Sequence, residues 1–217
     1  SLILFKKNKN KTYFLMGRRP PKQKFMPNIY VFPGGAVEKE DENVEYLKDF
    51  SKLELRALSH NCSLKRARAI GLAAIRETYE ETGLLIGDSN NTFIKPQPQS
   101  WDKFVKNKIK PRLDILNYIA RAVTPKGQNK RFNARFFLCD ANFSYGSIEQ
   151  NEELLDIDWY SIENIVEKLT LAQVTMLVVE KAIMYLENNT KSSAKVTIPT
   201  YSRRKGKRVI RYKFFSK

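Results

Sequence analysis

Short runs of β-branched, aromatic and leucine residues, bounded by turn residues, predict a chain rich in short strands. Two strands are expected at the start, on either side of a lysine- and asparagine-rich turn. A third run stops abruptly at Pro33-Gly34-Gly35, which is typical of a strand that ends in a tight turn. The expected strands span residues 2–5, 13–18, 29–32, 131–140 and 155–159, and a basic hairpin about Gly206 is expected within 195–217.

A helical period of apolar residues predicts one well-defined helix from about Leu64 to Thr82. Ser63 can cap its start, and Gly83 can end it because glycine adopts the left-handed conformation that closes many helices. The apolar residues recur at the spacing of a single helix face, at Ala67, Ile70, Ala74 and Ile75.

Weaker patterns predict further helices over about 44–58, 101–105, 161–169 with Ser161 as its cap, and 171–188. Residues 88–111 are proline-containing and loop-like. Strands mixed with helices indicate an α/β (α+β) fold. A length of 217 residues suits one domain, 1–217, with a polar insertion at about 42–62 and a basic C-terminal extension at about 195–217.

The charge balance favours an anionic partner. The chain has 39 lysines and arginines against 23 acidic residues, a formal net charge of +16. Such an excess attracts phosphorylated metabolites, nucleic acid or an acidic membrane surface. No apolar run reaches the length of a membrane span, and two cysteines are too few for a disulfide framework. We therefore expect a cytoplasmic protein that has no membrane partner.

Three glutamates in the predicted central helix are the strongest chemical signal. Glu80 and Glu81 follow Glu77 by three and four positions, so the three carboxylates share one helix face. Clustered carboxylate oxygens suit Mg²⁺ or Mn²⁺, and such ions can neutralise a diphosphate that is attacked by water. Taken alone, however, three helical glutamates are more often a charged face exposed to solvent.

The surrounding residues resemble the Nudix box, whose pattern is Gly-x5-Glu-x7-Arg-Glu-U-x-Glu-Glu-x-Gly-U with U apolar. The matching residues are Gly35, Arg76, Glu77, Glu80, Glu81, Gly83 and Leu84. Thr78 replaces an apolar residue, and 40 residues separate Gly35 from Arg76 where the pattern has 13. An insertion of about 27 residues inside the box is similar to a longer Nudix subgroup that includes a peroxisomal coenzyme A diphosphatase.

The resemblance implies an α/β/α sandwich around a mixed β-sheet and a metal-dependent pyrophosphohydrolase. Its substrate would be a nucleoside diphosphate linked to another moiety, with coenzyme A or acyl-CoA first and ADP-ribose, NADH and dinucleoside polyphosphates still open. The two halves of the box must meet at the metal, so the insertion is expected to loop outward, either as a lid or as a passive excursion. Asp41 or Glu38 would take the place of the first box glutamate.

The resemblance also implies roles for individual residues. Glu77, Glu80, Glu81 and the carbonyl of Gly35 would bind Mg²⁺ (or Mn²⁺), and Arg76 would pair with a box carboxylate. Glu153 is either a further metal ligand or general base, or an ordinary loop acid.

Several basic residues are candidates for binding the substrate. Arg131 and Arg135 could grip its phosphates or form salt bridges with the insertion, and Arg18 and Arg19 share this ambiguity. The basic tail and its aromatic residues also suit RNA, so the rival function is a nucleic-acid-binding protein on a Nudix scaffold. A homodimer remains an alternative to a monomer.

Overall fold

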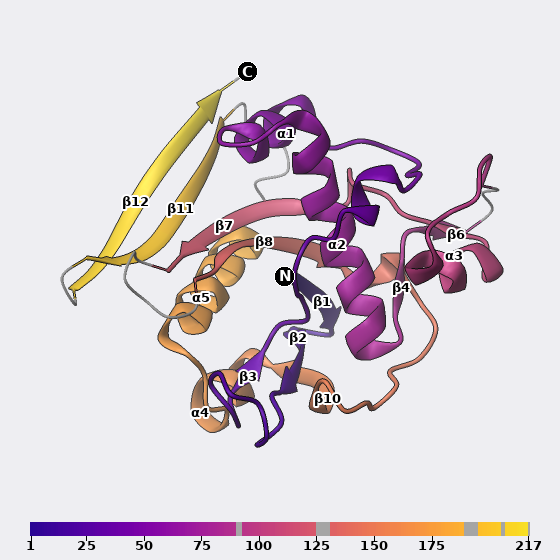
Figure 1. The fold of residues 1–217 in the computed structure, drawn as a ribbon. Helices are drawn as coiled ribbons and strands as arrows, with labels where there is room; N and C mark the ends of the chain where they lie inside the picture. Colours follow the sequence, from indigo (N-terminus) through magenta and orange to yellow (C-terminus); the bar gives the residue numbers. More distant parts are fainter. Residues whose placement is uncertain (90–92, 125–130, 189–194, 205–206, 217) are drawn as a thin grey trace.

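The computed structural model describes residues 1–89, 93–124, 131–188, 195–204 and 207–216. Within these ranges eight strands form one mixed sheet in the order β10-β2-β1-β8-β7-β11-β12, with β3 paired to β2 (Figure 1). The strands are β1 (Leu2–Asn8), β2 (Lys11–Arg18), β3 (Tyr30–Val31), β7 (Asn117–Val123), β8 (Asn133–Asp140), β10 (Leu155–Ser161), β11 (Lys195–Arg204) and β12 (Lys207–Ser216). Strand β1 runs parallel to β8, and β7 runs parallel to β11.

Helices cover both faces of this sheet. Helices α1 (Lys52–Ser59) and α2 (Leu64–Thr82) pack on one face, and α4 (Ile162–Lys168) and α5 (Gln173–Glu187) pack on the other. Each face of the sheet has its own hydrophobic core, and successive residues of β1 alternate between the two cores because side chains along a strand point to opposite faces. The predicted α/β/α sandwich around a mixed sheet is confirmed.

The remaining elements are η1 (Glu40–Asn43), β4 (Leu85–Ile86), β5 (Asp88–Ser89), η2 (Gln99–Trp101), α3 (Asp102–Lys106), β6 (Ile109–Lys110), η3 (Ala141–Phe143) and β9 (Ser144–Tyr145).

The central helix forms as predicted. Ser63 accepts a hydrogen bond from the backbone N–H of Arg66, and Gly83 closes the helix with φ +78°. Several other expectations need correction. The pattern over 44–58 yields a helix only from Lys52, and the strand expected from Arg131 begins at Asn133. The helix expected at 101–105 is present as α3, but the rest of 88–111, expected to be loop-like, also contains the short strands β5 and β6. Strand β7 was not among the expected strands.

The insertion does not simply loop outward, and that expectation is wrong. Phe50 is 5% exposed and Leu58 is 2% exposed, so the insertion contributes to the core. The Phe50 ring stacks on Phe137 of β8, with ring centroids 5.9 Å apart. Arg56 of α1 also donates a hydrogen bond to the carbonyl of Ser216 in β12. The insertion therefore ties the box helix to the C-terminal hairpin.

We predict that Gly71→Ala will destabilise the protein by about 1–3 kcal/mol through overpacking. A Cβ at Gly71 of α2 would lie 2.6 Å from the ring of Phe50. In a helix without this contact the same change would be stabilising by about 1 kcal/mol. A loss of stability would therefore report the contact between Gly71 and the insertion. Denaturant unfolding of Gly71→Ala with and without Phe50→Leu measures this. An equal effect of Gly71→Ala in both backgrounds would contradict the prediction.

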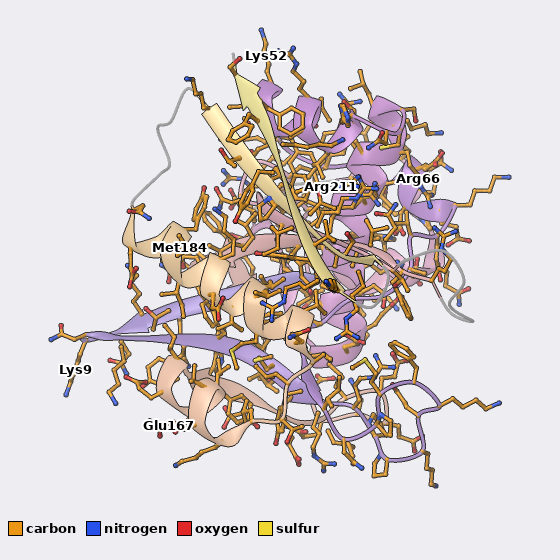
Figure 2. The ribbon with its side chains drawn as sticks, turned by 90° about the vertical axis from the view of Figure 1, so that its left-hand side faces the viewer. Lys9, Lys52, Arg66, Glu167, Met184 and Arg211 are labelled. Atoms are coloured by element: carbon orange, nitrogen blue, oxygen red, sulfur yellow. The ribbon has the colours of Figure 1, made fainter. Side chains whose placement is uncertain are left out.

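The C-terminal extension forms the expected hairpin, although its turn about Gly206 lies outside the described residues. Strands β11 and β12 pair from Lys195↔Ser216 to Arg204↔Lys207. Figure 2 shows this hairpin on the same side of the molecule as the start of α1, where Lys52 is labelled. Among the helices in the described ranges, none has the length and apolar composition needed to cross a bilayer.

Candidate functional site

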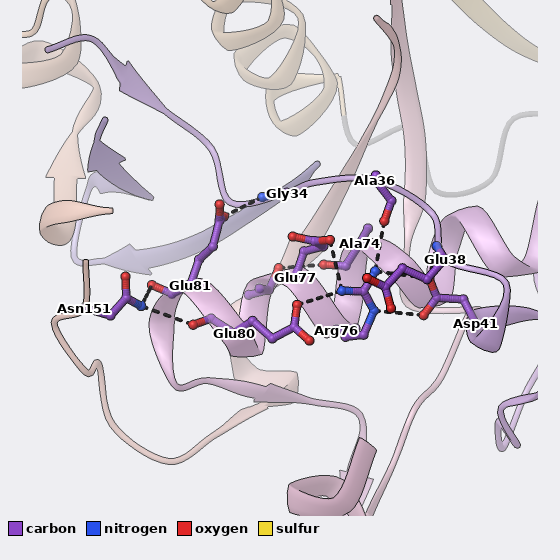
Figure 3. A network of polar contacts seen from close by, with 11 residues as sticks. Gly34, Ala36, Glu38, Asp41, Ala74, Arg76, Glu77, Glu80, Glu81 and Asn151 are labelled. Atoms are coloured by element: carbon purple, nitrogen blue, oxygen red, sulfur yellow. Dashed lines mark hydrogen bonds and ion pairs between the residues drawn. The ribbon is translucent and has the colours of Figure 1, made fainter. Parts of the chain in front are cut away.

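The three box glutamates lie on the last turns of α2, beside the loop that follows β3 (Figure 3). The backbone N–H of Gly34 donates a 2.7 Å hydrogen bond to Oε2 of Glu81. A Cβ built on Gly35 would overlap the carboxylate of Glu77, so only glycine allows the loop to approach this closely. The two halves of the box therefore meet in space despite the insertion between them.

Arg76 joins the insertion, the loop and the helix. Its side chain is 2% exposed, and it donates hydrogen bonds to both carboxylate oxygens of Asp41, which is fully buried. The same guanidinium donates to Glu77 at 3.0 Å and to Glu80 at 2.6 Å. It also donates to the carbonyl of Ala36 at 2.9 Å. Pairing of Arg76 with box carboxylates is thus seen, and Asp41 serves as its buried counterion.

The carboxylates lie in a region of excess negative charge. The pKa of Glu81 is raised to about 8, mainly by burial and also by the charges of Glu77 and Glu153, against the lowering effect of the Gly34 N–H. Burial also raises the pKa of Glu77 and of Glu80, partly offset by Arg76. A bound cation would relieve this repulsion.

In the described part of the chain, no three His, Cys, Asp or Glu side chains converge closely enough to enclose a metal ion. Two of the three box glutamates point oxygens at Arg76 instead. The chemistry of the donors still fits Mg²⁺ or Mn²⁺, because hard carboxylate oxygens and the backbone of Gly35 gather at one place.

Glu153 lies near the box carboxylates, since its charge raises the pKa of both Glu77 and Glu81. Asn151 positions it. The amide nitrogen of Asn151 donates to the carbonyls of Glu80 and Glu81, and its oxygen accepts the backbone N–H of Glu153. Sequence reasoning missed Asn151, because one asparagine in a polar loop carries no pattern.

We expect Asn151→Ala to lower kcat/KM about ten-fold or more, as the loss of a residue that orients catalytic groups does. The loop that carries Glu153 would lose its anchor on the end of α2. Steady-state kinetics together with thermal unfolding checks this, with Asn142→Ala on η3 as the matched asparagine control. Unchanged kinetics in Asn151→Ala would show that the anchor is dispensable.

The structure separates the two arginines at the end of β2. Arg18 donates to Asp156 at 2.6 Å and to Asn28 at 3.1 Å, so it is engaged at the surface. Arg19 instead experiences the charge of Glu81, and its buried Nε has no hydrogen-bond partner among the described residues. Arg19, rather than Arg18, is therefore the arginine available to the carboxylate site.

An aromatic pair lies beside Arg19. The guanidinium carbon of Arg19 is 5.9 Å from the centroid of Phe25, and the Phe25 ring is 5.0 Å from that of Phe132. Arg131 precedes β8 and is exposed. Arg135 lies on β8 in a separate cleft with Arg121 and Tyr118. The two arginines that the sequence grouped are thus placed differently, and the expected salt bridges to the insertion are not found for either within the described residues.

The chain is similar to known proteins in sequence and in fold. The acyl-coenzyme A diphosphatase NUDT19 of Xenopus laevis is 23% identical in an alignment that covers 68% of this chain and 52% of that protein. The chain therefore spans about half the length of this relative. A crystal structure of a Nudix hydrolase from Alicyclobacillus acidocaldarius superposes with a TM-score of 0.66 and 21% identity, covering 86% of this chain and 93% of that one. No family model matches the chain. The sequence similarity to an acyl-coenzyme A diphosphatase and the fold shared with a Nudix hydrolase both support the resemblance of this chain to the Nudix family.

Proposed function

We propose that this protein hydrolyses the diphosphate bond of a nucleoside diphosphate linked to another moiety. The observation that carries the proposal is the meeting of Glu77 and Glu81 with the Gly34-Gly35 loop across the long insertion, with Glu80 joined to Glu77 through Arg76. In the reaction, water adds across the P–O–P bond: its oxygen bonds to one phosphorus, and the bridging oxygen leaves on the other phosphate and takes up a proton.

Glu77, Glu80, Glu81 and the carbonyl of Gly35 would hold Mg²⁺ or Mn²⁺. When bound, the metal would neutralise the charge of the diphosphate and lower the barrier to attack by water. Glu153 is proposed to accept the proton of the attacking water. Arg19 is proposed to bind a phosphate of the substrate, and the Phe25–Phe132 pair offers a ring surface for a base or another flat group.

Coenzyme A or an acyl-CoA is proposed as the first substrate to test. The support is the sequence similarity to the acyl-coenzyme A diphosphatase of Xenopus laevis. The long insertion within the box of this chain is a second resemblance, to a Nudix subgroup, drawn from the sequence. ADP-ribose, NADH and dinucleoside polyphosphates are the alternatives, because all share a diphosphate attached to a nucleoside.

The test is a panel of these compounds, each incubated with the protein and Mg²⁺ or Mn²⁺, with products separated by chromatography. We expect hydrolysis that disappears in EDTA and returns with added metal. Full activity in EDTA would overturn the metal proposal. Absence of hydrolysis of every compound, combined with RNA retained on the purified protein, would favour the rival function of nucleic-acid binding.

A further inference from the structure

A cleft lined with cations lies apart from the box carboxylates. It is bounded by α1 of the insertion, by β7 and β8, and by the C-terminal hairpin. Arg121, Arg135 and Lys213 face it from three different strands, together with the hydroxyl-bearing residues Tyr118 and Thr200. None of the described residues that line it is acidic.

The cations in this cleft are not neutralised by the protein. Arg121 donates to the side chain of Asn133 at 2.8 Å, and Arg135 donates to the carbonyl of Asn133 at 3.1 Å. Neither arginine, nor Lys213, forms a salt bridge within the described ranges. Other arginines of this chain do pair with carboxylates; they are Arg18, Arg66, Arg68, Arg76 and Arg112.

The positive charges of the cleft oppose one another. Burial lowers the pKa of Arg135, and the neighbouring charge of Arg121 lowers it further. Burial raises the pKa of Tyr118 to about 12, so its hydroxyl stays a hydrogen-bond donor at neutral pH. Unused guanidinium N–H groups, an ammonium and hydroxyl donors in one concave place match the oxygens of a phosphate group.

We propose that this cleft binds the terminal phosphate of a small phosphorylated molecule. The lining cations come from three strands and converge on one place, which suits a single phosphate group. Arg135 points to the same face of β8 as Phe137 and Cys139, which pack in the core with the box helix, so the cleft and the carboxylate site lie on the same face of the sheet. One source of the phosphate is therefore a second phosphate of the hydrolysed substrate, and the other is a separate ligand.

The first experiment measures binding of inorganic phosphate in EDTA by thermal shift and by calorimetry. Arg121→Gln and Lys213→Gln should each weaken binding about ten-fold or more, while Arg208→Gln should not. Arg208 is a matched control because it lies on the same hairpin, is exposed and does not line the cleft. Equal loss in Arg208→Gln, or no phosphate binding to the wild-type protein, would overturn the site.

The second experiment identifies the source and rests on the proposed function. Coenzyme A carries a phosphomonoester on its ribose that dephospho-coenzyme A lacks. The ratio of their kcat/KM values therefore measures how much that phosphate contributes to recognition of the substrate. A ratio that falls about ten-fold in Arg121→Gln assigns the cleft to the substrate. If Arg121→Gln loses phosphate binding but leaves the ratio unchanged, the cleft is assigned to a separate ligand. If single-stranded RNA binds the cleft variants and wild type equally and phosphate does not bind, the charge serves nucleic acid and the proposal fails.

Discussion

Glu81→Gln is expected to lower kcat by about 10²-fold or more at saturating Mg²⁺, the effect of losing one key electrostatic stabiliser. The amide keeps the oxygen that accepts the Gly34 N–H, so the loop should stay in place. What disappears is one negative charge at the proposed metal, where the developing charge of the transition state is greatest. Steady-state kinetics on the best substrate measures the effect.

Folding should survive this change. Burial disfavours the charged form of Glu81, and Glu77 and Glu153 add repulsion, so the variant should unfold in EDTA at the same or a higher temperature than wild type. Glu152→Gln is the matched control, since Glu152 is an exposed acid on the neighbouring loop. A Glu81→Gln protein with near wild-type turnover would refute the assignment of the carboxylate site.

Arg76→Met is expected to lower the free energy of unfolding by about 3–5 kcal/mol. Methionine preserves much of the volume of the side chain, so the loss would come mainly from charge. Asp41 would remain fully buried with neither of its two hydrogen bonds from Arg76. Glu77 and Glu80 would also lose their cation.

A second ion pair on the same helix provides the comparison. Arg68 pairs with Asp49 at 2.7 Å, but the two side chains are 28% and 33% exposed. Because solvent screens this pair, Arg68→Met should cost about 1 kcal/mol or less. Asp41→Asn in the Arg76→Met background should recover part of the stability by removing the buried charge. Equal losses from Arg68→Met and Arg76→Met in chemical denaturation would contradict the structural role given to Arg76.

Elements with strong local signals were predictable from the sequence. The box helix has an apolar stripe, a serine cap and a glycine stop, and all three are present in the structure. Elements defined by distant partners were not. Strand β7 interrupts its apolar run with Arg121, and α1 depends on packing against the hairpin that lies about 150 residues later in the chain. Such contacts leave no periodic trace in a single sequence.

The candidate site likewise has residues that could be predicted from the sequence and residues that could not. Glu77, Glu80 and Glu81 are three and four residues apart, so helix geometry alone brings them together. Arg18 and Arg19 are adjacent in sequence but point to different surroundings. Because Asp156 binds Arg18, Arg19 is the one available to the carboxylate site, and the sequence alone does not reveal this pairing. Asn151 acts through backbone carbonyls, which every residue type offers, so its partners could not be identified from residue identities.

The parallel pairing of β1 with β8 has a consequence for how the chain folds during synthesis. A hydrogen bond between Ser1 and Arg135 spans 134 residues, and Leu2 pairs with Phe137. At roughly 5–20 residues per second, on the order of ten seconds pass before the partner of β1 leaves the ribosome. During that interval the apolar residues of β1 and β2 have no completed sheet to enter. Long-range parallel pairing also folds slowly, so the β1–β2 hairpin is exposed to aggregation until β8 has been made.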